Sequence, residues 1–338
     1  MKPNNFDLAR LLLASIVIYF HCHALSGSAA LQPLSVFSGH LAVECFFVIS
    51  GFLIFASYER SKGLKDYYAK RARRILPGYW FATLLSLGIV LYFTHALHVG
   101  KYLLANLSFL TFLAPGVPGV FEHNPGNASM NGSLWTIKIE VMFYIAVPLL
   151  VWMCRRFGRL QTLVPIAVAS VVYRVLLAKS HPTLALQLPG QMSFFCGGAI
   201  TYYYLPEFKR YGRWLVAPAI LAYIVHAYFG VFFLRPFALT VLVLAFSLLL
   251  PEIKGPTRWG DFSYGVYVLH YPIIQTLIAL GLFERAPWAA VALVTALVAC
   301  VSVLSWYAVE RRWLSSRAHP PSELRRMEEG ARAAAVSS

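Results

Sequence analysis

The sequence predicts an all-α protein that crosses a membrane as a bundle of about ten helices and keeps both termini in the cytoplasm. Of its 338 residues, 59% are hydrophobic and only 13% are charged, whereas about a quarter of the residues of a soluble domain are charged. The apolar segments are long and continuous, which argues against the short alternating strands of a β-barrel. Inside a bilayer, such segments satisfy their backbone groups by forming helices.

The formal net charge of +15 raises the alternative of a nucleic-acid-binding protein. The Lys and Arg residues, however, lie in short connections between apolar segments and not on one amphipathic surface. This distribution is typical of membrane proteins, whose cytoplasmic loops are rich in Lys and Arg. We therefore expect membrane lipids as partners, and no nucleic acid.

The first helix is expected at about Phe6–Gly27. It is as long as a full span and has no small-residue cleavage site, so we expect it to remain in the protein. The second helix follows at about Ser38–Tyr58. The connection after it is crowded with basic residues, which places this loop and the N-terminus in the cytoplasm. These residues are Arg60, Lys62, Lys65, Lys70, Arg71, Arg73 and Arg74.

The third helix is expected at about Pro77–Leu97, and a long outer segment follows it up to about Gly132. The first half of this segment, Tyr102–Leu113, is semi-apolar and either lies in the interface or re-enters the membrane. The second half, Pro115–Gly132, is rich in Pro, Gly and Asn and predicts a loop.

Seven further helices are expected. Every second connection between helices is rich in Lys and Arg, so these basic connections all lie on the same side of the membrane. The seven helices are expected at about Ser133–Met153, Leu160–Ala178, Leu184–Leu205, Trp214–Phe229, Phe232–Leu250, Phe262–Phe283 and Pro287–Val309. Residues 1–313 thus form one transmembrane domain, and the polar, basic residues 314–338 are expected to form a disordered cytoplasmic tail. The five cysteines show no paired spacing, which favours buried thiols over disulfides or a metal site.

Ionisable residues inside apolar helices mark candidate functional positions, because their burial in lipid is costly. Arg10 and His21 are eleven residues apart, close to three helical turns, so they share a face and lie roughly 16 Å apart along the axis. Glu44 and Glu140 lie at a similar depth to His21 in the second and fourth helices. If His21 and Glu140 pair, the carboxylate would orient the imidazole as a general base that activates a hydroxyl group.

Other embedded polar residues extend this set. His40 lies one turn above Glu44 on the same helix face. Ser263, Tyr267 and His270 share one face of the ninth helix, although His270 can equally serve helix packing through a cross-helix hydrogen bond.

Four arginines are expected to converge at the cytoplasmic mouth of the bundle: Arg10, Arg71, Arg73 and Arg74. Guanidinium groups bind phosphate in a bidentate manner, so this cluster suits a phosphorylated ligand. The general excess of Lys and Arg in cytoplasmic loops would by itself explain Arg71, Arg73 and Arg74, without any ligand. The position of Arg10 inside the first helix favours binding.

Five sequence elements occur in a fixed order over nearly the whole chain. They are the first-helix pair Arg10 and His21, FFVISGF (Phe46–Phe52), KRARRILP (Lys70–Pro77), SLWTIKIEVMFY (Ser133–Tyr144) and SYGVYVLHYP (Ser263–Pro272). In these elements the chain resembles the acyltransferase 3 family of integral membrane O-acyltransferases. The last helix departs from the family pattern, because SWYAVERRW lacks the proline that often follows the glutamate. The role of Glu310 is therefore left open.

The resemblance implies transfer of an acyl group, usually acetyl from acetyl-CoA, to a hydroxyl of a lipid-linked or surface polysaccharide at a bacterial inner membrane. The arginines would hold the phosphates of acyl-CoA, and His21 would deprotonate the acceptor. Tyr267 or Ser263 would stabilise the oxyanion. With Glu140 these three form the expected catalytic set, and no metal is expected. The expected substrate-binding residues are Glu44, His40, His270 and Trp135.

Two other classes of function remain. A transporter or exporter of an anionic lipid or glycan could use the same embedded residues. Inverted repeats with broken helices would favour it, and the sequence shows no convincing repeat. A scaffold subunit of a polysaccharide-synthesis complex would use its polar residues only for packing, and would tolerate substitution of both His21 and Glu140. Direct transfer and transfer through an acyl-histidine are both compatible with these residues.

Overall fold

The computed structural model describes residues 4–94, 99–253, 255 and 259–315, and the regular structure in these ranges is helical. The tail expected at 314–338 lies almost entirely outside the described residues. The long α-helices are α1 (Phe6–Ser26), α2 (Gly39–Glu59), α3 (Leu64–Thr94), α5 (Trp135–Phe157), α6 (Arg159–Leu177), α8 (Leu188–Tyr203), α9 (Leu205–Phe229), α10 (Leu234–Leu248), α11 (Ser263–Ala279) and α13 (Pro287–Ser305). Short helices are η1 (Ala29–Val36), α4 (Gly100–Leu107), α7 (Pro182–Ala185), α12 (Leu282–Arg285), the π-helical turn η5 (Trp306–Glu310) and α14 (Arg311–Ser315).

Each of the ten expected helices has a counterpart among these long helices. Seven helical stretches in the described residues are long and apolar enough to cross a membrane. The helices α8, α10 and α11 fall short of 18 residues, with 16, 15 and 17 respectively. In α11 nearly every side chain is buried, so this helix forms the centre of the bundle and contributes little surface to lipid.

The third helix begins thirteen residues earlier than the expected Pro77. Its first turn is polar and is stabilised by an ion pair between Lys70 and Asp66 at 2.6 Å, four residues apart. The same carboxylate accepts the backbone N–H of Lys62 at 3.0 Å. A negative charge in the first turn also suits the helix dipole. The expected start was wrong because hydropathy does not detect a helix that extends beyond the apolar segment.

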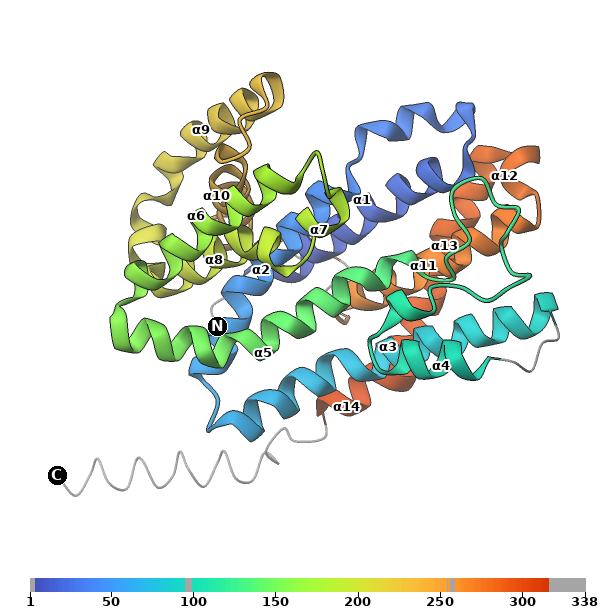
Figure 1. Cartoon of the computed structure of the whole chain (residues 1–338), viewed down its shortest axis with the longest axis horizontal. Helices are drawn as coiled ribbons and strands as arrows, with labels where there is room; N and C mark the ends of the chain where they lie inside the picture. Colours follow the sequence, from blue (N-terminus) through green and yellow to red (C-terminus); the bar gives the residue numbers. More distant parts are fainter. Residues whose placement is uncertain (1–3, 95–98, 254, 256–258, 316–338) are drawn as a thin grey trace.

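The bundle has two groups of helices around a shared centre. The helices α6, α8, α9 and α10 gather on one side, α3, α4 and α14 lie along the other, and α1, α2, α5 and α11 run between them (Figure 1). Helix α2 packs on α1, α5, α8 and α10, and α1 also packs on α11. We call the end of the bundle where α1 begins the proximal end, and the end where α1 finishes the distal end.

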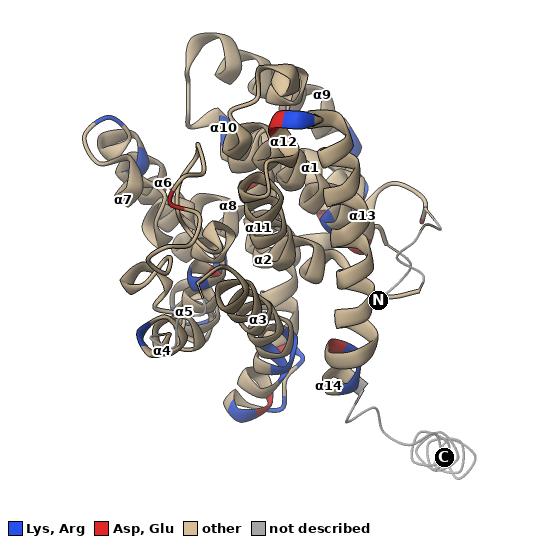
Figure 2. Cartoon of the chain, turned by 90° about the vertical axis from the view of Figure 1, so that its right-hand side faces the viewer, with Lys and Arg blue, Asp and Glu red and all other residues tan. Residues whose placement is uncertain are grey.

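Lys, Arg, Asp and Glu residues lie mostly near the ends of the helices and in the connections, and most of the helical ribbon carries none of them (Figure 2). This surface exposes many large apolar side chains on α6, α9 and α13. Such a distribution suits a protein that is surrounded by lipid along its helices.

The distal end is covered by the segment between α4 and α5. Its part Pro115–Gly132 was expected to be a loop, and the segment is irregular over most of its length. Fully buried Gln275 of α11 donates to the backbone oxygens of Asn127 at 2.6 Å and Ser129 at 3.0 Å. The Asn131 amide donates to the Val268 oxygen at 2.8 Å. These bonds fix the segment to α11 above the polar residues described next.

Candidate active site

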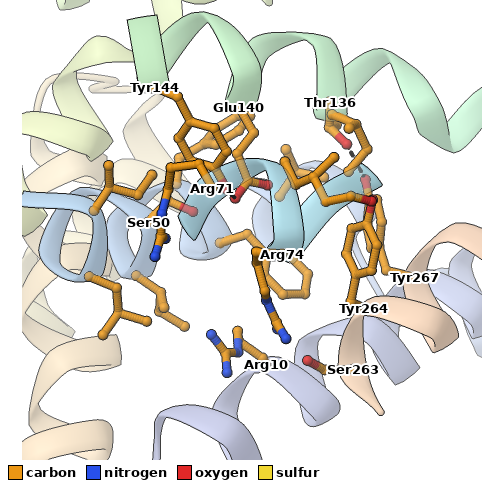
Figure 3. A pocket seen from close by; sticks show the side chains of 18 residues that line it. Arg10, Ser50, Arg71, Arg74, Thr136, Glu140, Tyr144, Ser263, Tyr264 and Tyr267 are labelled. Carbon is orange, nitrogen blue, oxygen red and sulfur yellow. Dashed lines mark hydrogen bonds between the residues drawn. The ribbon is translucent and has the colours of Figure 1, made fainter. Parts of the chain in front are cut away.

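Three guanidinium groups meet in a cavity that opens near the proximal end. Arg10 comes from α1, and Arg71 and Arg74 come from the first turns of α3. Arg71 and Arg74 are three residues apart and therefore share a face. Arg73, which was expected to join them, does not line the cavity, because it lies more than half a turn around the helix from Arg71. The side chains of Arg10 and Arg74 point toward each other, with Ser263 beside them (Figure 3).

The cavity has about 790 Å³ of empty space, including its open mouth. Beyond the arginines its walls are largely apolar and come from α2, α3, α5 and α11. The apolar lining consists of Val43, Phe46, Phe47, Ile49, Leu53, Ile54, Ile75 and Ile137. A charged entrance that leads into an apolar passage suits a ligand with phosphates at one end and a long neutral arm at the other.

Asp261, in the connection before α11, holds two of the three arginines in place. Its Oδ2 accepts from Nη2 of Arg10 at 2.6 Å and also from Arg74. Burial raises the pKa of the Asp261 carboxyl, but the charges of Arg10 and Arg74 more than offset this and leave its pKa below the ordinary value. Arg71 has no such acidic partner in the described chain; its guanidinium lies 5.7 Å from the centre of the Tyr144 ring.

Glu140 lines this cavity and has a partner other than His21. Its Oε1 accepts from the Tyr144 hydroxyl at 2.6 Å, one turn further along α5. The pairing of His21 with Glu140 that the sequence suggested is therefore not formed. The two helices turn these side chains in different directions, and a common depth in the membrane does not fix the rotation of a helix about its axis.

His21 instead contacts His270 of α11. Their rings are stacked with centroids 5.0 Å apart, and Nδ1 of His21 lies 2.9 Å from Nε2 of His270. Nδ1 of His270 lies 2.7 Å from the backbone oxygen of Tyr267. His270 is fully buried, whereas His21 keeps part of its surface accessible.

This network assigns the protons on both rings. A carbonyl oxygen only accepts, so Nδ1 of His270 carries a proton, and the neutral ring offers Nε2 as an acceptor. Nδ1 of His21 is then the donor to that nitrogen. Nε2 of His21 then carries the lone pair of the neutral ring. In this tautomer Nε2 of His21 can accept a proton, and His270 lies where a carboxylate orients the imidazole in other hydroxyl-activating sites.

Tyr267 connects the cavity with the histidine pair. It lines the far end of the cavity, where its hydroxyl and that of Thr136 lie 2.7 Å apart (Figure 3). Its ring centroid lies 5.9 Å from that of His270. His21 itself does not line the cavity, so Tyr267 stands between the passage and the histidines. Ser263 lies at the opposite end and donates to Asp261 at 2.5 Å.

The expected substrate-binding residues lie at the distal end but not in one site. Glu44 is 1% exposed and forms ion pairs with Arg174 and with Arg235, the second at 2.6 Å. His40 is exposed one turn above it. Trp135 is half-buried at the start of α5 and does not line the arginine cavity.

Three functional candidates were missed in the sequence. Arg174 and Arg235 each interrupt an apolar segment, so the criterion that identified Arg10 would have found them. Asp261 lies in a connection and gives no comparable signal. Glu310, whose role was left open, is buried in the π-helical turn η5, accepts from Ser305 at 2.8 Å and lies beside Gly78, one turn from Arg74.

Comparison with known proteins identifies the family of the chain. Residues 4–307 match the acyltransferase 3 family model, described as an acyltransferase domain. The chain is 30% identical to the O-acetyl transferase of Shigella phage Sf6 over 330 residues, covering 93% of this chain and 97% of the relative. It is 30% identical to nodulation protein 10 of Rhizobium leguminosarum bv. viciae over 318 residues, with 82% and 84% coverage. The exopolysaccharide production protein ExoZ of Rhizobium meliloti (strain 1021) is 28% identical over 261 residues, with 72% and 79% coverage.

No solved structure shows significant similarity to the chain. The family match, however, spans α1 to η5 and includes the arginine cavity and the histidine pair. The apolar helices and the family together make this an integral membrane protein. The chain belongs to the acyltransferase 3 family and is a membrane acyltransferase.

Proposed function

We propose that this protein transfers an acetyl or other short acyl group from cytoplasmic acyl-CoA to a hydroxyl of a lipid-linked or exported polysaccharide in a bacterial inner membrane. The observation that carries the proposal is the arginine cavity, whose far wall, Tyr267, contacts the base formed by His21 and His270. The printed names of relatives, an O-acetyl transferase and an exopolysaccharide production protein, support the acyl group and the acceptor class.

In this proposal the chain crosses the membrane ten times and the proximal end faces the cytoplasm. The phosphates of the donor bind Arg10, Arg71 and Arg74, with Arg71 free of a competing carboxylate in the described chain. The neutral pantetheine arm lies along the apolar walls that α2 and α5 supply. The thioester then reaches the Tyr267 end of the cavity.

The acceptor hydroxyl approaches from the distal side. Nε2 of His21 takes the hydroxyl proton while the oxygen attacks the thioester carbonyl carbon. The C–S bond then breaks, the acyl group stays on the acceptor oxygen, and the CoA sulfur leaves with the proton held by His21. The Nδ1–H of His21 donates to His270 throughout and becomes a stronger, charge-assisted bond when His21 is protonated.

Tyr267 is the better placed of the two residues expected to stabilise the oxyanion. Its hydroxyl lies at the end of the cavity nearest the histidines, whereas Ser263 lies among the arginines and is bonded to Asp261. Transfer requires the Tyr267 hydroxyl to exchange Thr136 for the thioester oxygen. The same movement opens the passage toward His21.

The test uses purified protein in lipid nanodiscs with labelled acetyl-CoA and a polysaccharide precursor. His21→Ala is expected to abolish label transfer to the glycan without loss of folded protein. Arg10→Ala and Arg71→Ala are expected to raise KM for acetyl-CoA about tenfold or more, because each removes a charge-assisted contact. Arg73→Ala, on the same helix but outside the cavity, is the matched control and should leave KM unchanged.

Three results would contradict the proposal. Unchanged glycan acylation in His21→Ala would remove its role as the base. Equal KM values for acetyl-CoA in Arg71→Ala and Arg73→Ala would remove the donor site from the cavity. Movement of a lipid or glycan across the membrane without any acylation would instead favour the transporter alternative.

A further inference from the structure

A second charged cluster lies at the distal end of the bundle, where five helices meet. Glu44 of α2 accepts from Arg174 of α6 and, at 2.6 Å, from Nε of Arg235 of α10. Gln191 of α8 accepts from Arg174 at 3.1 Å, and His226 of α9 lies 3.2 Å from Nη1 of Arg235. The donor site described above uses none of these residues.

The cluster carries an excess of positive charge. Two guanidinium groups share one carboxylate, so one positive charge is left uncompensated by Glu44. Both arginine side chains are only partly accessible, at 11% and 18%. The carboxylate and the aromatic rings hold the guanidiniums in place; that of Arg174 lies 4.7 Å from the centre of the Phe232 ring. A partly buried, preorganised guanidinium pair with one excess charge suits an anion such as phosphate.

An apolar groove of about 2140 Å³, including its open side, runs along the bundle beside this cluster. Its wall on α6 is a valine stripe at helical spacing that includes Val164, Val168, Val172 and Val175. Residues of α9 and α10 form the opposite wall, and α8 forms the floor. The floor is close-packed because Gly197 lets α8 approach Thr240, whose Oγ1 would lie 2.2 Å from an added Cβ.

The groove and the cluster are continuous. Phe232, over which Arg174 lies, and Pro236, next to Arg235, both line the groove at its distal end. Along α6 the valine stripe runs from Val164 to Val175, eleven helical steps or roughly 16 Å at 1.5 Å per residue, which matches an extended hydrocarbon chain in one leaflet. A ligand that fills both parts has one long hydrocarbon chain and an anionic group at its outer end.

The cluster is also linked to the base. His40 lies one turn from Glu44 on α2 and is within electrostatic range of Glu44, Arg174 and Arg235, and of His21. The ring of Phe20, next to His21 in sequence, lies 6.5 Å from the His40 ring. A group attached to an anion at Arg174 and Arg235 therefore has a short route past His40 to His21.

We propose that this groove and the Arg174–Glu44–Arg235 cluster bind the lipid carrier of the acceptor, a single-chain polyprenyl phosphate that bears the glycan. The chain lies in the groove, the phosphate binds Arg174 and Arg235, and the sugar extends past His40 to His21. This inference rests on the proposed acyltransferase function and names the acceptor site that such a function requires.

The first experiment compares two acceptors, a polyprenyl-phosphate-linked sugar and the same sugar without lipid. Val168→Trp fills the groove, and Leu149→Trp on α5 is the matched control, because both native side chains are 58% exposed and only Val168 lines the groove. Val168→Trp is expected to raise the ratio of KM for the lipid-linked acceptor to KM for the free sugar about tenfold. Leu149→Trp should leave this ratio unchanged. An equal effect of the two variants would overturn the groove assignment.

Arg235→Gln is expected to raise the same ratio. Because loss of one partner of a buried ion pair can unfold the protein, a second measurement uses the wild-type chain. Its thermal midpoint in detergent is measured with polyprenyl monophosphate, uncharged polyprenol or phosphatidylglycerol. A rise specific to polyprenyl monophosphate supports the proposal. An equal rise with phosphatidylglycerol indicates a general anionic-lipid site, and an equal rise with polyprenol removes the role of the arginines; either result overturns it.

These measurements separate the two proposals. If neither acceptor is acylated but polyprenyl monophosphate still raises the thermal midpoint selectively, the proposed function fails and the lipid site remains. If the free sugar and the lipid-linked sugar are acylated with the same KM in wild type, the carrier site fails and the acyltransferase function remains.

Discussion

Replacement of His270 tests the proposed base most directly, because this residue is assigned only an orienting role. His270→Leu keeps the buried volume approximately and removes the acceptor of the His21 Nδ1–H. The lost bond is worth about 1 kcal/mol while His21 is neutral and about 3 kcal/mol when it is protonated in the transition state. The difference of about 2 kcal/mol predicts a fall in kcat of about 30-fold.

The assay is the initial rate of acetyl transfer at saturating acetyl-CoA, with the thermal midpoint as a check on folding. His270→Gln places an amide oxygen where Nε2 stood, so it should recover most of the loss. His181→Leu, at an exposed position, is the control. KM for acetyl-CoA should stay constant in all three variants, because His270 does not line the arginine cavity.

A double variant sharpens the test. If His270 acts only through His21, then His21→Ala with His270→Leu should be no slower than His21→Ala alone, since residues that act as a unit are strongly non-additive. Rate losses that multiply would refute the relay. Full activity of His270→Leu would also refute the orienting role of His270. It would instead support the role in helix packing that the sequence left open.

Two further predictions follow from neighbouring residues. Asp261→Asn removes a largely buried partner of two arginines and should lower the free energy of unfolding by about 3–5 kcal/mol. Because the Asp261 pKa is lowered in the folded protein, the carboxylate stabilises the fold fully above about pH 4, and this stabilisation is lost as the pH falls below that value. The free energies of unfolding of wild type and variant should therefore differ by a constant amount from pH 5 to 8 and become equal in acid. Tyr267→Phe should lower kcat about 10²-fold at unchanged KM for acetyl-CoA. Thr136→Val frees the Tyr267 hydroxyl and should not lower kcat. An equal loss of kcat in both variants would show that the bond between the two hydroxyls is only structural.

The helices were predictable because each long apolar run is locally encoded. Their bounds in α1 and α2 agree with expectation to within one residue. The start of α3 was not predictable from hydropathy, because Leu64 to Arg74 is helical for a local electrostatic reason outside the apolar segment. This helical extension determines which arginines line the cavity, because it places Arg71 and Arg74 on one helix face and Arg73 on another.

The partners of the polar residues were predictable only in part. Depth along a helix follows from sequence, and it correctly placed Arg10 and His21 at the two ends of one face. The rotation of one helix against another depends on packing over the whole bundle, which is why the partner of His21 is His270 and not Glu140. Asp261 was beyond prediction for a different reason. A carboxylate in a connection is readily solvated, so its position in the sequence does not mark it as functional. Only the fold shows that Asp261 contacts Arg10.

The packing of α1 on α11 explains why both ends of the proposed reaction path are on one helix face. Both helices run from the proximal to the distal end. Arg10 meets Asp261 just before α11 begins, and His21 meets His270 within it. The two positions are eleven residues apart on α1, or roughly 16 Å, and Asp261 and His270 are nine residues apart along the chain. A rigid pair of parallel helices thus sets the distance between the guanidinium cluster and the imidazole base, and a donor that bridges them needs a long neutral arm between its phosphates and its acyl carbon.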